Sequence, residues 1–113
     1  MVGQGYVPDA GHIVWLEFSP QAGHEQAGRR PGLVLSPRSY NEKSSVALFC
    51  PVTSKVKGYP FEVLLPPSMR VTGVVLSDQV RSMDWRARRA RFEEQAPAQV
   101  VREVKEKLSV LLP

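Results

Sequence analysis

The chain has 113 residues, of which 42% are hydrophobic, and its formal net charge at pH 7 is +4. This length suits a single domain over residues 1–113, and the hydrophobic fraction supports a packed core, which excludes an intrinsically disordered protein. No apolar run approaches the ~20 residues of a membrane-spanning helix, and the first residues lack the apolar core of a signal peptide. We therefore expect a cytoplasmic protein without membrane association.

Most of the predicted elements are short strands. Apolar and β-branched runs bounded by proline, glycine and polar clusters are typical of strands. Such runs cover residues 11–18, 32–35, 46–52, 61–65, 71–76 and 79–83, with 90–93 a weaker candidate. Between the second and third of them, Ser36 and Pro37 offer a capping residue followed by proline at the first helical position, which predicts one helical turn over 38–43.

Only the last segment has a strong helical period. It starts at Ala96 and Pro97, and Val100, Val104, Leu108 and Leu111 recur at intervals of four, four and three residues. This pattern indicates a helix that covers the core. Six or seven short strands and one terminal helix predict a mainly β protein, with a small, strongly bent β-barrel or sheet packed against the helix.

The connection between the first two strands, residues 20–31, is the most informative segment. Its twelve residues exceed what a hairpin needs, so it is expected to carry function. It combines Glu25, which can accept a proton, with Gln26, Arg29 and Arg30. An arginine fork suits phosphate oxygens, so the segment favours phosphodiester chemistry without a metal.

The excess positive charge is local. Residues 81–91 hold five arginines and one acid, Asp84, which accounts for the whole net charge of +4. Such a cluster suits an anionic partner. The alternative is a solvated basic strand.

Several strings occur in an order that resembles the MazF-type mRNA interferases, the toxins of toxin–antitoxin pairs. They are E-Q-A-G-R-R-P at 25–31, P-V-T-S at 51–54, K-G-Y-P-F-E-V at 57–63 and D-Q-V-R-S at 78–82. The resemblance implies the SH3-like β-barrel of MazF and CcdB with a C-terminal α-helix, assembled as a homodimer. It also implies a sequence-specific, metal-independent endoribonuclease that cuts single-stranded mRNA, leaves 2′,3′-cyclic phosphate and 5′-hydroxyl ends, and is neutralised by a MazE-like antitoxin.

The resemblance also assigns roles within the site. Arg30 and Thr53 match the family's catalytic arginine and threonine, and Glu25 matches a carboxylate suspected of acting as a base or of orienting the loop. The alternatives are a loop ion pair for Arg30 and a turn at a strand end for Thr53. His12 and His24 permit a scheme with two imidazoles, but we interpret His12 as a surface residue and give His24 only a binding role.

RNA-binding candidates follow from the expectation of a positive groove with planar groups for base stacking. They are Phe18, His24, Gln26, Lys55, Lys57, Gln79, Arg81, Arg86 and Arg88.

No cofactor or metal is expected, because two histidines twelve residues apart and one cysteine match no zinc spacing. Cys50 lies in an apolar run and is interpreted as a small buried thiol.

Two other functions compete with the endoribonuclease. One is a non-enzymatic CcdB-like toxin of the same fold that binds a protein target such as gyrase. The other is a catalytically degenerate nucleic-acid-binding regulator. The segment from Glu25 to Pro31 together with Thr53 favours the enzyme, since a protein poison does not need these groups.

Overall fold

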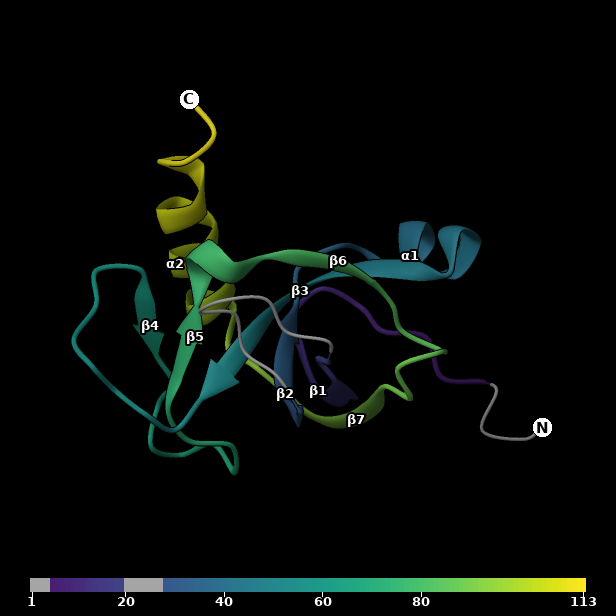
Figure 1. Ribbon diagram of the computed structural model, residues 1–113, viewed down its shortest axis with the longest axis horizontal. Coiled ribbons are helices and arrows are strands. Elements are labelled where there is room, and N and C mark those ends of the chain that lie inside the picture. Colours follow the sequence, from purple (N-terminus) through teal and green to yellow (C-terminus); the bar gives the residue numbers. More distant parts are fainter. Residues whose placement is uncertain (1–4, 20–27) are drawn as a thin grey trace.

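The computed structural model describes residues 5–19 and 28–113, which form an antiparallel sheet with two α-helices (Figure 1). The elements in chain order are β1 (His12–Glu17), β2 (Arg29–Val34), α1 (Arg38–Ser44), β3 (Val46–Thr53), β4 (Glu62–Leu64), β5 (Val74–Leu76), the short 3₁₀-helix η2 (Ser77–Gln79), β6 (Arg81–Asp84), β7 (Arg91–Gln95) and α2 (Ala98–Ser109). Every predicted strand and both helical segments are present, with ends that differ by a few residues.

The sheet is organised around β3, its longest strand. Among the described residues the strand order is β4-β5-β3-β2-β1-β7, and β6 pairs with the first half of β3. The second half of β3 pairs with β5, so β6 and β5 share one edge of this strand and β2 pairs with the other. No pairing joins β4 to β7 within the described part, so the sheet is not closed, and the mainly β class with a C-terminal helix is confirmed.

Two apolar clusters cover the two faces of the sheet. Ile13 and Val14 are neighbours on β1 whose side chains point to opposite faces, and both are fully buried, each in a different cluster. The Ile13 cluster includes Val100 and Val104 of α2, while the Val14 cluster includes Trp85. Figure 1 shows α2 beside β4 and β5, at the end of the molecule opposite α1.

The C-terminal helix is shorter than its apolar period predicts. α2 ends at Ser109, so Leu111 lies beyond it and is exposed, as is Leu112. Val100 and Val104 are buried as expected, since they repeat on the face that meets the sheet. No helix in the described part of the chain is both long enough and apolar enough to cross a membrane.

Candidate active site

A pocket of about 700 Å³ opens where β3 ends, between that strand end, the segment after it and η2. It gathers residues from three separate parts of the sequence, namely Arg30, the span 53–62 and the span 76–79. Five of the predicted site residues line it: Arg30, Thr53, Lys55, Lys57 and Gln79. A second hollow of about 580 Å³ lies beside the start of α2 and contains none of the predicted site residues.

Strand register explains why Arg30 and Thr53 meet. β2 and β3 are antiparallel, and Gly32 lies opposite Pro51. The paired ladder ends there, and its register continued by two residues leads Arg30 toward Thr53, so both line the pocket. On its other edge, β2 pairs Arg30 with Leu16 of β1. The backbone of Arg30 is therefore held by β1, and β2 is paired with β3 from Gly32 onward.

Thr53 is almost completely buried, with 7% of its surface exposed. Its Oγ1 accepts a hydrogen bond of 3.1 Å from the backbone N–H of Lys55, so Thr53 closes the turn that follows β3. A hydroxyl that accepts one hydrogen bond keeps its own proton to donate, and the pocket is where a phosphate oxygen would receive it. The predicted alternative, a turn residue at a strand end, is thus present, and its geometry leaves the hydroxyl proton of Thr53 able to donate.

Both acids of the pocket already have donors. The Glu62 carboxylate accepts the backbone N–H groups of Lys57 and Gly58 at 3.1 and 3.0 Å. Asp78 accepts the hydroxyl of Tyr59 at 3.0 Å, and this hydrogen bond raises the pKa of Tyr59. These contacts fix the segment that presents Lys57. The three cations of the lining, Arg30, Lys55 and Lys57, outnumber its two carboxylates, which makes the pocket suitable for an anion.

Phe18 does not fit the expectation of a base-stacking surface. Its side chain is fully buried in the Val14 cluster, and Gly32 packs so closely that an added Cβ would lie 3.0 Å from the ring. The ring belongs to the core because Phe18 directly follows β1 and keeps the inward alternation of that strand. This part of the RNA-binding prediction is corrected.

The three arginines predicted to bind RNA lie outside the lining of this pocket. Arg81 donates to the Phe18 carbonyl at 3.0 Å, and Arg88 donates to the carbonyls of Glu17 and Ser19 at 2.9 and 2.7 Å. Arg86 is exposed and lies over the ring of Trp85. Two of these arginines therefore hold the backbone around the end of β1, and their role in binding RNA stays a prediction.

Glu25, His24 and Gln26 lie outside the described residues, so their predicted roles stay predictions. The described residues on either side of positions 20–27 are joined by two hydrogen bonds. Phe18 N–H donates to the Gly28 carbonyl at 2.9 Å, and Gly28 N–H donates to Ser19 Oγ at 3.1 Å.

His12 is half-buried and not a surface residue as predicted. Its Nδ1 accepts a hydrogen bond of 2.9 Å from the Tyr6 hydroxyl, and burial lowers the pKa of the imidazole.

Cys50 is buried as expected, and burial raises the pKa of its thiol to about 12. Among residues 5–19 and 28–113, no three histidine, cysteine or acidic side chains lie together as a metal-binding group.

Sequence reasoning missed three residues that shape the site. Tyr59 and Asp78 form a hydrogen-bonded pair in the pocket, and both stand in the strings that carry the family resemblance. The third is Gly73, with φ of +114°; an added Cβ there would lie 2.1 Å from the Thr53 carbonyl oxygen. A glycine inside an apolar strand pattern is the signal for such a close backbone approach.

The open antiparallel sheet and its arginine–threonine pocket define a small protein with a cationic site suited to a phosphodiester. Comparison with known proteins identifies the family: residues 9–112 match the PemK-like, MazF-like toxins of type II toxin–antitoxin systems. The chain belongs to this family. It is 47% identical over 107 residues to the endoribonuclease toxin MazF of Escherichia coli K12, covering 95% of this chain and 96% of that protein.

Solved structures agree with this assignment. The crystal structure of MazF from Deinococcus radiodurans superposes with a TM-score of 0.92 at 63% identity, over 95% of this chain and 97% of that one. A MazE–MazF structure from the same organism matches with a TM-score of 0.84 at 56% identity, over 95% and 96% of the two chains. The predicted MazF-like fold is thereby confirmed.

Proposed function

We propose that this chain, an endoribonuclease toxin by its family, cleaves single-stranded mRNA at a short sequence without a metal ion. The observation that carries the proposal is the meeting of Arg30 and Thr53 in one cationic pocket at the end of β3. The enzymatic relatives favour this interpretation over a non-enzymatic toxin of the same fold.

RNA carries its own nucleophile, the 2′-hydroxyl. In the proposed reaction this oxygen loses its proton and attacks the phosphorus, while the bond from phosphorus to the 5′-oxygen breaks and that oxygen takes up a proton. The products are a 2′,3′-cyclic phosphate and a 5′-hydroxyl, and atoms balance without a co-reactant.

Each site residue has a part in this scheme. The Arg30 guanidinium stabilises the charge that gathers on the phosphate oxygens in the transition state. Thr53 donates its hydroxyl proton to a non-bridging oxygen, and Glu25 takes the proton from the 2′-hydroxyl or orients the loop. Lys55 and Lys57 hold the neighbouring phosphates, because they line the same pocket.

We further propose a homodimer that acts in the cytoplasm and is neutralised by an acidic, MazE-like antitoxin. The Deinococcus MazE–MazF structures support such a partner for this chain. A carboxylate-rich peptide suits the cations of the pocket as a phosphate chain does, so the antitoxin and the RNA would compete for the site.

The test is cleavage of a synthetic RNA in excess EDTA. We expect full activity and a cyclic phosphate end. An oligonucleotide with one deoxynucleotide directly 5′ of the scissile phosphate should resist cleavage, whereas the same change two residues away should be tolerated. Loss of activity in EDTA, or cleavage of the deoxy-substituted bond, would contradict the mechanism.

A further inference from the structure

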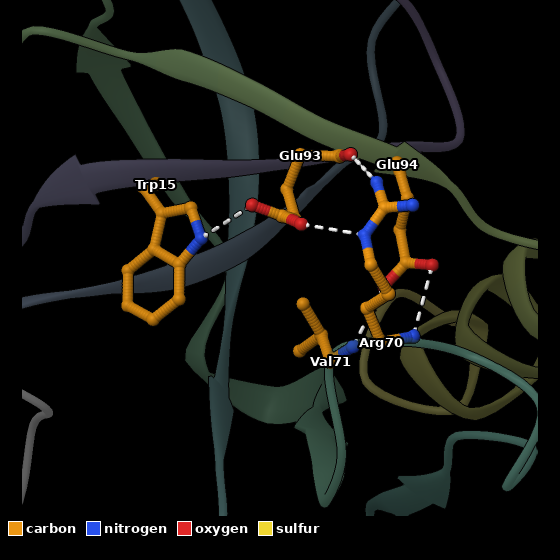
Figure 2. A network of polar contacts seen from close by, with 5 residues as sticks. All are labelled: Trp15, Arg70, Val71, Glu93 and Glu94. Atoms are coloured by element: carbon orange, nitrogen blue, oxygen red, sulfur yellow. Dashed lines mark hydrogen bonds and ion pairs between the residues drawn. The ribbon is translucent and has the colours of Figure 1, made fainter.

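The strand β7 carries a β-bulge at Glu93. Ile13 of β1 lies opposite Glu94, but the next residue, Val14, lies opposite Phe92, so Glu93 is an extra residue in the ladder. A bulge interrupts the alternation of side chains and changes the direction in which they point. Here it brings two successive carboxylates, Glu93 and Glu94, to the same turn of the chain (Figure 2).

That turn lies between β4 and β5. Glu94 accepts the backbone N–H of Arg70 at 3.1 Å and of Val71 at 2.7 Å. The Glu93 carboxylate accepts a hydrogen bond of 2.8 Å from Arg70 Nε and one of 3.2 Å from the Trp15 indole N–H. Figure 2 shows this carboxylate between the two donors.

The two carboxylates differ in what they contribute. The ion pair between Glu93 and Arg70 is exposed at its arginine end, and exposed ion pairs stabilise little. Glu94 instead makes two charge-assisted hydrogen bonds to backbone groups, which fixes the chain itself and not one long side chain. Glu94 therefore holds the backbone of the turn from outside, in addition to the bonds from Met69 N–H to the Pro66 carbonyl and from Leu65 N–H to the Gly73 carbonyl.

Two residues after Val71, the chain reaches the active site. Gly73 adopts φ of +114° and packs against the end of β3, where an added Cβ would lie 2.1 Å from the Thr53 carbonyl oxygen and 3.0 Å from the Ser54 α-carbon. The next residue, Val74, lies opposite Thr53 in the ladder between β3 and β5. These two contacts connect the turn to Thr53 through the chain.

We propose that Glu94 is a positioning residue for Thr53, acting through the turn at Arg70 and Val71 and through the close contact of Gly73. The catalytic consequence rests on the function proposed above, in which the Thr53 hydroxyl binds the reacting phosphate. Glu94 does not line the pocket, so it acts through Thr53 and has no contact of its own with substrate.

The structural arm of the test does not depend on activity. Lys55 N–H is bonded to Thr53 Oγ1 and reports whether the threonine keeps its place. In Glu94→Ala, and to a smaller degree in Glu94→Gln, we expect faster hydrogen exchange at this amide. Val7→Ala serves as control, because Val7 is buried in the other cluster and its loss destabilises the fold without touching the turn. Unchanged exchange in Glu94→Ala would overturn the proposal.

The kinetic arm asks whether Glu94 acts through Thr53. Displacement of a reacting group by about 1 Å can cost on the order of 10²-fold. We expect kcat of Glu94→Ala to fall roughly 10- to 100-fold while KM changes less than about twofold. In a Thr53→Ala background the same substitution should change kcat by less than about twofold, because the group that it displaces is gone.

Equal losses in both backgrounds would overturn the positioning role. If Thr53→Ala alone cleaves at the wild-type rate, the catalytic assignment of Thr53 fails, and the exchange at Lys55 still decides whether Glu94 positions it. Glu106→Gln is the matched charge control, since Glu106 is exposed on α2, and it should leave both the exchange and kcat unchanged.

Discussion

The guanidinium of Arg81 lies over the ring of Phe18, 5.8 Å from its centroid, and donates a hydrogen bond of 3.0 Å to the Phe18 carbonyl. Arg88 holds the carbonyls on either side of that residue, those of Glu17 and Ser19. The basic stretch 81–91 therefore supports the backbone that leads into the segment 20–27, besides supplying positive charge. Among the described residues, the Arg86 side chain shows no comparable hydrogen bond to a backbone carbonyl. Its guanidinium is stacked on Trp85.

This difference predicts separate effects for Arg88→Ala and Arg86→Ala. Removing Arg88 leaves two backbone carbonyls without their charged donor, which should lower the free energy of unfolding by about 1–3 kcal/mol. Removing Arg86 loses an exposed stacking contact of about 0.5–1 kcal/mol. Chemical denaturation measures both, and a greater loss for Arg86→Ala would contradict the structural role of Arg88.

The active-site residues predict an order of rate losses. Thr53→Ala removes a neutral donor, which typically costs on the order of 10²–10³ in rate, and Arg30→Ala removes a charged fork and should cost more. Thr53→Ser keeps the hydroxyl and is the matched control, expected to retain most of the activity. Single-turnover cleavage of a defined RNA gives the rates. An active Arg30→Ala protein would rule out the assigned role of that arginine.

Glu25→Gln separates a base from a scaffold. If Glu25 takes the proton from the 2′-hydroxyl, the rate should fall by roughly 10²–10⁴ while RNA binding persists, because glutamine keeps the shape but not the basicity. His24→Ala should have a mild effect. Rates are measured by cleavage and affinities with a substrate that carries a 2′-deoxy block. Loss of binding together with rate would favour the scaffold role.

The sequence predicts what is local and misses what depends on distant partners. Apolar runs between prolines and glycines located β1, β2 and β3, and the family strings located Arg30 and Thr53, which the register of β2 and β3 brings together. The structural use of Arg81 and Arg88 was not predictable, since the carbonyl partner of Arg81 lies 63 residues away and those of Arg88 lie 71 and 69 residues away. Neither periodicity nor composition signals the bulge at Glu93, because it exists only relative to β1.

Exposed apolar side chains support the prediction of a homodimer. Leu48 on β3 and Phe92 on β7 are 39% and 44% exposed, although both stand on strands of the sheet. Burying such groups against a second copy removes apolar area from water. Light scattering at micromolar concentration should give about twice the chain mass of 12.6 kDa. A monomer at concentrations where RNA is cleaved would contradict the prediction.

His12 should make stability depend on pH. Its Nδ1 accepts hydrogen bonds from the Tyr6 hydroxyl at 2.9 Å and from the Asp9 backbone N–H at 3.3 Å. The Asp9 N–H can only donate, so Nδ1 carries no proton and the ring is neutral with its hydrogen on Nε2. Burial lowers the pKa of His12 below its usual 6.5, although the Asp9 carboxylate opposes this shift.

Because the folded protein binds this proton less readily than the unfolded chain, the contribution of His12 is complete above pH 6.5 and is lost as the pH falls through the lowered pKa. We expect the free energy of unfolding to decrease between pH 7.5 and pH 5.5, and to decrease less in His12→Gln, whose amide oxygen can accept the same two hydrogen bonds. His24 is present in both proteins, so its titration cancels in the difference. Denaturation at both pH values measures that difference, and an NMR titration should give His12 a pKa below 6.5. Equal pH dependence in the two proteins, or a His12 pKa above that value, would show that the imidazole is not held neutral by its surroundings.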